Sequence, residues 1–322
     1  MADESILILA DPNGKAWEFA QKVYQKLNSN PKRERKYHLV EVEITKFNDG
    51  EIFTKILENV REKDCYFIHD SSMNPQDWFV SLALLNCALM RSSAGKINDV
   101  LPYIKYSRQD RMVDPRTPIS ARVIADIITL RANRVLTADL HNPASASNYA
   151  IPFDNLKAYP VIIKHLKEKY SEFLKNAVVV SPDLGGAVRA KSYAGRLELE
   201  VVLTDKERKK AGAVEGMTII GNVEGKNCII VDDMIDTGGT LIKAAEILKQ
   251  KGAEEIWAVA THGIFSKDAI EKLNNSPLNK IIVTDSIPQN TDGKIEVVSL
   301  ADLFAEAIYR ISHGLSVSEL FK

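Results

Sequence analysis

The chain has 322 residues, 45% of them hydrophobic, so it is long enough to bury a substantial core, and its length favours two domains over one. Its 42 basic and 43 acidic side chains leave a formal net charge of -1, which provides no global field to hold a nucleic acid or an anionic membrane. Three widely spaced cysteines without a CxxC pair disfavour a disulfide framework and a zinc site, and they fit a reducing, cytoplasmic compartment.

The N-terminal segment is expected to be a buried strand and not a targeting signal. MADESILILADPNG is acidic, and its apolar run, SILILA, is short for a signal peptide. The longest apolar segment, SLALLNCALM, is too short to span a bilayer and predicts a core helix. The basic cluster at Lys32, Arg33, Arg35 and Lys36 precedes strand-like sequence, which favours a solvated turn over a nucleic-acid patch. We therefore expect neither a membrane nor a nucleic acid as a partner.

Short apolar runs alternate with helical patterns along the chain, which is typical of parallel sheets covered by helices. The predicted strands are, in chain order, SILILA, CYFIH, INDVLPYI, RVLTADL, AVVVS, CIIVDD, EIWAVATH and KIIVTDS. Helices are predicted at WFVSLALLNCALMRSSAG and at TLIKAAEILKQKG. In the second, Leu241, Ala244, Ala245 and Leu248 recur at helical spacing, and Gly252 is the expected C-terminal cap.

A weak internal repeat suggests two similar halves. ISARVIADIITLRANRVLTADLH and TLIKAAEILKQKGAEEIWAVATH share the order helix, turn, strand and histidine, which places His141 and His262 in corresponding positions. The simplest explanation is a duplication whose halves join near YAIPFDNLKAYP.

Ligands of open parallel sheets bind beyond the carboxyl ends of the strands. Four predicted strands run there into charged or glycine-rich sequence, namely KYSRQDR, DLH, PDLGG and DDMIDTGGT. We expect these four segments to meet at one edge.

The segment DDMIDTGGT combines an anion cradle with carboxylates. Its second half would place backbone N–H groups and hydroxyls at a helix N-terminus, where a phosphate is favoured; the residues are Asp236, Thr237, Gly238, Gly239 and Thr240. Asp232 and Asp233 are acceptors for a vicinal diol and ligands for Mg2+. The pattern predicts a sugar phosphate, and the alternative is an ordinary helix cap after an acidic turn.

VDDMIDTGGT resembles the phosphoribosyl-pyrophosphate (PRPP) motif of phosphoribosyltransferases and PRPP synthetases. From about residue 40 to the end, further segments resemble ribose-phosphate pyrophosphokinases in the same order: KFNDGE, YSRQDR, DLH, IPFDNL, SPDLGGAVRA, TDKER and SVSELF. The resemblance implies an α/β protein with two similar phosphoribosyltransferase-like domains, each a parallel sheet flanked by helices. Residues 1–156 would carry the ATP side and oligomer contacts. Residues 157–322 would carry the ribose 5-phosphate site and a catalytic loop, with a tail that packs back on the first domain.

The implied activity is that of a ribose-phosphate diphosphokinase in nucleotide biosynthesis. The enzyme would transfer the diphosphate of ATP to the C1 hydroxyl of ribose 5-phosphate, giving PRPP and AMP, with Mg2+ as cofactor. Because charge spreads over the phosphoryl oxygens, catalysis depends on positioning and electrostatic stabilisation. Direct displacement is expected, since no Ser or Cys nucleophile with a partnered base is evident. The resemblance also implies a homo-oligomer, a hexamer or a smaller assembly built from dimers.

By resemblance, Arg108 and Gln109 hold ATP, and the Arg108 guanidinium could stack on adenine or pair with phosphate. A second segment would complete this pocket from a neighbouring subunit, although FNDGE is also a common turn. Its residues are Phe47, Asp49, Gly50 and Glu51.

His141 and Asp183 match the family's positions for Mg2+ and the ATP phosphates. Mg2+ prefers oxygen ligands, so Asp183 suits it better, and His141 would act through water or directly on a phosphate. A lone histidine after a strand is otherwise often a core residue. Gly185 and Gly186 would cradle the transferred diphosphate.

Residues 204–216, TDKERKKAGAVEG, lack apolar anchors and predict a mobile loop that closes over the site. Lys206 and Arg208 match the family's catalytic lysine and arginine, which would neutralise charge on the β-phosphoryl group and on the leaving AMP. Arg208 is also assigned to the ribose 5-phosphate site. An exposed basic loop without a role is the alternative.

Several positions depart from the family pattern. Glu207 stands where another basic residue is usual, and Val188 stands where lysine is frequent. NPASASNYA, residues 142–150, replaces a stretch that contributes to a regulatory phosphate or ADP site in many members, and MVDPRT is less basic than usual. Regulation by phosphate or ADP is left open.

Two rival functions follow from the same motifs. A catalytically silent regulatory subunit of a PRPP synthetase is disfavoured because Lys206, Arg208, His141 and Asp183 are all present. A phosphoribosyltransferase, which would consume PRPP, is disfavoured because it needs neither RQDR nor FNDGE.

Overall fold

The computed structural model describes residues 5–29, 35–207, 216–289 and 293–321. The chain divides into two compact units. Unit 1 comprises Met1–Lys157, Ser286–Pro288 and Leu300–Lys322, and unit 2 comprises Ala158–Asp285 and Gln289–Ser299. No helix in the described part of the chain combines the length and the apolar character needed to cross a membrane.

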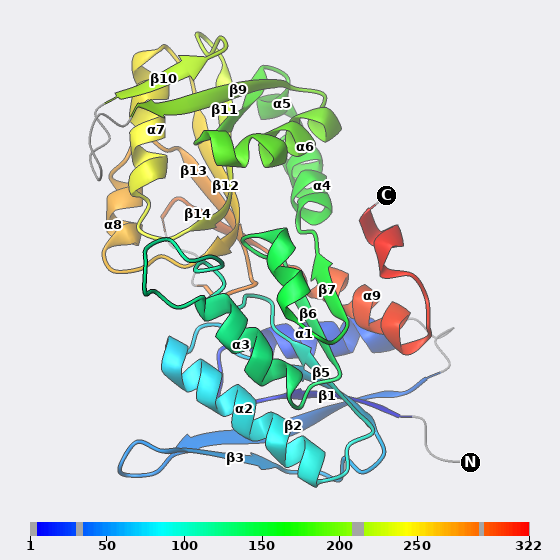
Figure 1. Ribbon diagram of the computed structural model, residues 1–322. Coiled ribbons are helices and arrows are strands. Elements are labelled where there is room, and N and C mark those ends of the chain that lie inside the picture. Colours follow the sequence, from blue (N-terminus) through cyan, green and yellow to red (C-terminus); the bar gives the residue numbers. More distant parts are fainter. Residues whose placement is uncertain (1–4, 30–34, 208–215, 290–292, 322) are drawn as a thin grey trace. The chain divides into compact units, whose positions relative to one another are not determined.

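Unit 1 is built on a seven-stranded sheet in the order β3-β2-β1-β4-β5-β6-β7 (Figure 1). All neighbouring strands are parallel except β3, which is antiparallel to β2. The strands are β1 (Ile6–Ala10), β2 (Tyr37–Lys46), β3 (Ile52–Ile56), β4 (Asp64–Ile68), β5 (Lys96–Val100), β6 (Arg134–Ala138) and β7 (Phe153–Leu156). The helices are α1 (Trp17–Asn28), α2 (Pro75–Arg91), α3 (Ser120–Thr129) and α9 (Ala301–Ser312), with 3-10 turns η1 (Pro143–Asn148) and η3 (Val317–Phe321).

Unit 2 has a second seven-stranded sheet, in the order β10-β9-β8-β11-β12-β13-β14. Only the β9–β10 pair is antiparallel. The strands are β8 (Ala177–Ser181), β9 (Glu200–Glu207), β10 (Gly216–Ile220), β11 (Asn227–Ile235), β12 (Ile256–Gly263), β13 (Lys280–Thr284) and β14 (Ile295–Val298). The helices are α4 (Tyr159–Lys169), α5 (Ser171–Leu174), α6 (Ala187–Leu197), α7 (Gly239–Gln250) and α8 (Ala269–Asn274), with the 3-10 turn η2 (Leu184–Gly186).

The two sheets have the same strand order once β1 is matched with β8 and each later strand with its successor. The predicted α/β fold with two similar domains of mainly parallel sheet is confirmed. The predicted alignment of the repeat is wrong, however. His141 follows β6, whose counterpart is β13, whereas His262 lies in β12, whose counterpart is β5. Because every repeating unit reads helix, turn, strand, the sequence comparison matched segments that are one strand out of step.

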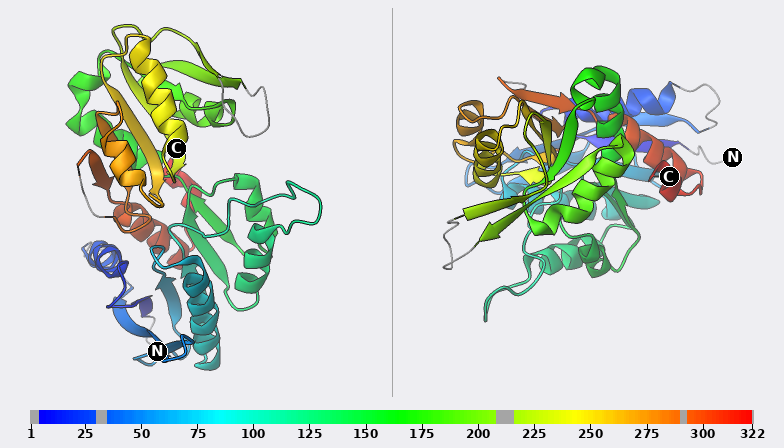
Figure 2. Two further views of the ribbon diagram at one scale, coloured as in Figure 1. Left: turned by 90° about the vertical axis from the view of Figure 1, so that its left-hand side faces the viewer. Right: turned by 90° about the horizontal axis from the view of Figure 1, so that it is seen from above.

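The cores follow from the hydrophobic patterns. Every residue of β1, β8 and β12 is buried, as expected for strands covered by helices on both sides. In α7 the four residues predicted to face the core are buried, and Gly252, the predicted C-terminal cap, has a left-handed backbone with φ +86°. In unit 1, α9 lies beside α1 (Figure 2), and the rings of Phe19 and Phe304 pack edge to face with centroids 5.6 Å apart.

The strand ends differ from the sequence expectation in two ways. The four charged or glycine-rich segments do not follow strands of one sheet, because β5 and β6 belong to unit 1 whereas β8 and β11 belong to unit 2. In addition, β11 continues to Ile235 because it stays paired with β12 as far as Gly263, so Asp232 and Asp233 lie within the strand.

Candidate active site

The loop between β11 and α7 has the geometry of an anion cradle. Gly238 precedes the helix with φ +76°, and a Cβ atom there would lie 3.0 Å from the Leu273 side chain, so glycine is favoured at this position. The N–H groups of Thr237 and Gly238 have no hydrogen-bond acceptor within the described ranges. Thr237, Gly239 and Thr240 are exposed. Free amide donors at the N-terminus of a twelve-residue helix favour an anion.

Asp236 begins this loop, and its carboxylate accepts a hydrogen bond from the Ser266 hydroxyl. Ser266 lies shortly after β12, the neighbouring strand. Sequence reasoning missed this residue, although its position just beyond a strand end was a usable signal. The contact orients the carboxylate at the start of the loop.

Asp232 and Asp233 form an acidic pair beside the Arg189 guanidinium. The Arg189 guanidinium of α6 lies 3.0 Å from an Asp232 carboxylate oxygen and 3.4 Å from one of Asp233. Asp232 also accepts the Asp233 N–H at 2.8 Å. Burial and then the Asp233 carboxyl raise the pKa of Asp232 to about 7, although Arg189 acts in the opposite direction. Arg189 was not among the predicted site residues, because nothing in the sequence indicates which acids it meets.

The loop after β8 lies on the strand next to β11. The Asp183 carboxylate accepts the Gly186 N–H at 2.9 Å, and the Ser181 hydroxyl donates to the Asp183 carbonyl at 2.7 Å. A Cβ on Gly186 would lie 2.8 Å from the Ser181 hydroxyl oxygen, so glycine is required for close packing. Gly185 is exposed. Because β8 and β11 are adjacent and parallel, this loop and the cradle share one edge of unit 2.

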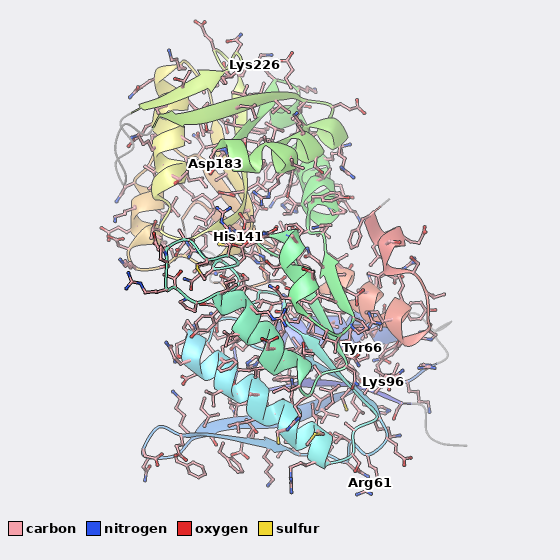
Figure 3. All side chains as sticks on the ribbon, viewed as in Figure 1. Arg61, Tyr66, Lys96, His141, Asp183 and Lys226 are labelled. Carbon is pink, nitrogen blue, oxygen red and sulfur yellow. The ribbon has the colours of Figure 1, made fainter. Side chains whose placement is uncertain are left out.

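Two predicted ATP residues lie at the entrance to α3 in unit 1. Arg108 is exposed, whereas Gln109 is partly buried and its side-chain oxygen accepts a hydrogen bond from the Ser120 hydroxyl. The Gln109 carbonyl accepts the Ala121 N–H at 3.1 Å. His141 follows β6 and is also exposed (Figure 3), so the alternative of a core histidine does not apply.

The segment FNDGE forms the turn of the β2–β3 hairpin. The Phe47 N–H donates to the Glu51 carbonyl at 2.8 Å, and Gly50 has φ +94°. Asp49 accepts the Glu51 N–H at 3.1 Å. Phe47 is 56% exposed and packs edge to face on Phe53, so its outer surface is available to a ligand or another chain. The backbone is that of an ordinary turn, and its part in a nucleotide pocket stays a prediction.

The predicted loop at 204–216 is wrong at both ends. Residues 204–207 belong to β9 and residue 216 to β10, because the two strands pair antiparallel from Thr204 opposite Ile219 to Glu207 opposite Gly216. Lys206 therefore lies on a strand near its end. Arg208 lies outside the described residues.

The predicted residues divide between the units. Those for ATP lie in unit 1, whereas Asp183, Lys206 and the sugar-phosphate residues lie in unit 2. His141 and Asp183, the predicted metal pair, come from different units, so their joint role stays a prediction. Within the described ranges, no group of three or more His, Cys, Asp or Glu side chains could hold a metal ion.

Comparison with known proteins decides the family. Residues 13–131 match the N-terminal domain of ribose phosphate pyrophosphokinase, and residues 213–322 match the phosphoribosyl synthetase-associated domain. Ribose-phosphate pyrophosphokinase of Vibrio parahaemolyticus is 44% identical over 290 residues, covering 88% of this chain and 91% of that protein. The chain belongs to the ribose-phosphate pyrophosphokinase family. The pyrophosphokinase of Caldanaerobacter subterraneus is also 44% identical, over 91% of this chain and 96% of its own length.

A solved structure extends this pyrophosphokinase assignment to the fold. The crystal structure of phosphoribosylpyrophosphate synthetase from Mycobacterium smegmatis matches with a TM-score of 0.84 and 30% identity, covering 97% of this chain and 99% of that one. The pyrophosphokinase fold is therefore shared along nearly the whole chain.

Proposed function

We propose that the protein is a ribose-phosphate diphosphokinase, which transfers the diphosphate of ATP to the C1 hydroxyl of ribose 5-phosphate and releases AMP. The observation that carries this proposal is the β11–α7 loop, where free amide donors lie next to the end of a strand that bears two carboxylates. Family membership makes the activity the expected use of that loop. The sugar phosphate would bind with its 5-phosphate on the loop and its ring hydroxyls on the carboxylates.

The individual residues have separate roles in this proposal. Asp236, Thr237, Gly238, Gly239 and Thr240 would hold the phosphate. Asp232 and Asp233 would accept hydrogen bonds from the ribose hydroxyls, and Asp183, Gly185 and Gly186 would bind the diphosphate. Removing the Asp236 carboxylate, in Asp236→Ala, should raise the KM for ribose 5-phosphate far more than the KM for ATP. Steady-state kinetics with each substrate varied would measure both, and an unchanged sugar requirement would refute the assignment.

Mg2+ is the expected cofactor, and when bound it would neutralise charge on the phosphates of ATP. Mg2+ commonly binds one or two protein carboxylates and takes its other ligands from water and substrate phosphates. Asp183 fits that pattern, because its carboxylate is only partly buried and sits at a strand end. His141 would reach the metal through water or contact a phosphate.

The nucleotide and catalytic assignments rest on the resemblance. Arg108, Gln109 and His141 would bind ATP, together with Phe47, Asp49, Gly50 and Glu51 from a neighbouring subunit. Lys206 and Arg208 would stabilise charge in the transition state. The domains would be residues 1–156 for ATP and oligomer contacts and residues 157–322 for the sugar and catalysis, with a C-terminal tail that packs back on the first domain.

A homo-oligomer is supported by apolar side chains on unit 1. Val80, Leu84 and Met90 of α2 are 39–42% exposed, and α2 packs beside β3, whose Phe53 is also exposed. Clustered exposed apolar groups of this kind favour a protein interface. The free thiols of the three cysteines fit a cytoplasmic location.

The first experiment is incubation of purified protein with ribose 5-phosphate, ATP and Mg2+, with AMP and PRPP followed by chromatography. AMP formed in step with PRPP would establish the diphosphokinase. Intact ATP in the presence of folded, ATP-binding protein would favour the silent regulatory subunit. Consumption of added PRPP with a free base would favour the phosphoribosyltransferase.

A further inference from the structure

A cavity of about 340 Å³ lies in unit 1 at the carboxyl ends of β1 and β4. Its polar lining comes from the loops that follow these strands and includes Asp11, Lys15, His69, Asp70 and Ser72. Because β1 and β4 are the counterparts of β8 and β11, this cavity occupies the place in sheet 1 that the sugar-phosphate loops occupy in sheet 2. The sugar-phosphate assignment to unit 2 does not account for it.

The strand registers show which residues correspond. Leu9 of β1 is paired with Phe67 of β4, and the matching positions of β8 and β11 are Val180 and Ile230. Asp70 stands three residues after Phe67, and Asp233 stands three residues after Ile230. Asp70 and Asp233 are therefore equivalent carboxylates in the two units.

These equivalent carboxylates have different partners. Asp233 lies beside the Arg189 guanidinium. Asp70 instead contacts the backbone of two loops, because one oxygen accepts the Lys15 N–H at 2.7 Å and the other accepts the Ser72 N–H at 2.8 Å. Asp70 is only 8% exposed. Two oxygens held by amides from neighbouring loops reproduce the contacts of a bound phosphate.

The rest of the cavity wall is mixed in charge, since Lys15 is among its lining residues. Asp11 lines it, and burial together with the nearby Asp70 carboxylate raises the pKa of Asp11. His69 is buried, and burial lowers its pKa to about 4, so it is neutral at pH 7. Its Nε2 lies 2.8 Å from the Trp78 carbonyl, which requires a proton on that nitrogen and makes Nδ1 an acceptor; Nδ1 has no partner in the described part of the chain.

We propose that this cavity of unit 1 is a latent site for a tetrahedral oxyanion and that Asp70 closes it by occupying the amide donors of Lys15 and Ser72. The carboxylate takes the place of phosphate, so the wild-type cavity excludes phosphate and sulfate. Asp70 thereby restricts binding at the β1/β4 edge without acting in catalysis. The proposal goes beyond the diphosphokinase assignment and does not depend on it.

The test replaces the carboxylate and asks whether an anion takes its place. Crystals of Asp70→Ala grown with selenate, a tetrahedral anion that anomalous scattering locates, should show an ion in contact with the Lys15 and Ser72 N–H groups. Sulfate should raise the melting temperature of Asp70→Ala more than that of wild type, with apparent affinity at least about tenfold higher at this site. Turnover per folded molecule should not change.

Asp11→Ala is the matched control, because it removes a carboxylate from the same wall but leaves Asp70 on both amides. Asp11→Ala should bind no selenate at the Lys15 and Ser72 amides. Its melting temperature in sulfate measures the general stabilising effect of this salt on proteins, which must be subtracted. If Asp70→Ala does not fold, Asp70→Ser, which frees at least one amide, is used in the same measurements. Folded variants without an ion at Lys15 and Ser72, or equal occupancy in wild type, would overturn the proposal.

Discussion

The loops after β4 and β11 occupy the same place in two sheets of identical strand order, yet they offer opposite surfaces to an anion. After β11, the Thr237 and Gly238 amides have no acceptor in the described part of the chain. After β4, Asp70 takes the Ser72 amide and also reaches the Lys15 amide of the neighbouring loop. The difference shows that the fold determines where a binding site lies, whereas the partners of a few backbone N–H groups determine whether that site binds an anion.

The largest expected effect is a loss of kcat, and it compares the antiparallel strand pairs at the edges of the two sheets. These pairs are β9–β10 in unit 2 and β2–β3 in unit 1. Only the first carries a catalytic lysine in our assignment. Lys206→Ala should lower kcat by about 100-fold or more while ATP binding is kept, because the charge acts mainly in the transition state. Rapid-quench kinetics and nucleotide titration measure the two quantities. Lys251→Ala, at an exposed site after α7, is the control, and a kcat loss of similar size there would contradict the role.

A substitution that displaces the free amides of the β11–α7 loop should weaken anion binding there, as we infer for the loop after β4. Gly238→Ala places a methyl group against Leu273 and forces a left-handed backbone on alanine, which costs about 1–2 kcal/mol. The displaced amides should raise the KM for ribose 5-phosphate about tenfold or more with little change for ATP. Gly225→Ala is the control, since Gly225 has φ +66° but nothing within 4 Å of a Cβ. Gly225→Ala should lower stability through backbone strain alone and leave the KM for ribose 5-phosphate unchanged. Equal KM values for ribose 5-phosphate in the two variants would refute the phosphate-binding role of the β11–α7 loop.

The surroundings of Asp232 in unit 2 predict a pH dependence of substrate binding. The pKa of Asp232 is raised to about 7, and the ionised carboxylate is a stronger acceptor for ribose hydroxyls than the protonated carboxyl group, so the KM for ribose 5-phosphate should fall as pH rises from 6 to 8. Arg189→Gln removes the charge that lowers this pKa, so the inflection should move to higher pH. Arg189→Lys should restore part of the shift. A KM without any inflection in this range would contradict the assignment.

The smallest effect on substrate binding is expected at Glu296, which serves as a control because it lies outside both loops that are compared. Glu296 of β14 lies away from the strand ends of the site, with Lys169 at 2.5 Å and Lys280 at 3.2 Å. Burial alone would raise the pKa of Glu296, but hydrogen bonds, first from Lys169 and Tyr170, outweigh burial and lower it to about 2.

Glu296→Gln should lower the free energy of unfolding by about 1–3 kcal/mol at pH 7 and leave the substrate KM values unchanged. Since the folded pKa lies below the ordinary value of 4.5, the advantage of wild type should shrink as pH falls from 4.5 toward 2. Urea unfolding at several pH values measures this, and a constant difference would contradict it.

The fold could be predicted because buried parallel strands appear as apolar runs that stand out from the helices between them. The cradle could also be predicted, since its glycines and threonines are contiguous in the chain. Arg189 and the contact of Asp70 with Lys15 could not be assigned, because the partners are distant in sequence, whereas Ser266 was missed although its position beyond a strand end was a usable signal. The C-terminal end of β11 could not be predicted either, because the strand continues to Ile235 through its pairing with β12 and not because of its local composition.

The packing of α9 on α1 has a consequence for synthesis of the protein on the ribosome. Unit 1 contains both α1 and α9, and Phe304 packs on Phe19 although it follows Phe19 by 285 residues, so this contact forms only after all of unit 2 has been synthesised. Unit 2 ends at Ser299 and can complete its sheet earlier. The nascent chain therefore waits with α1 uncovered, and a stop codon before α9 would release a molecule whose first helix exposes its apolar face to aggregation.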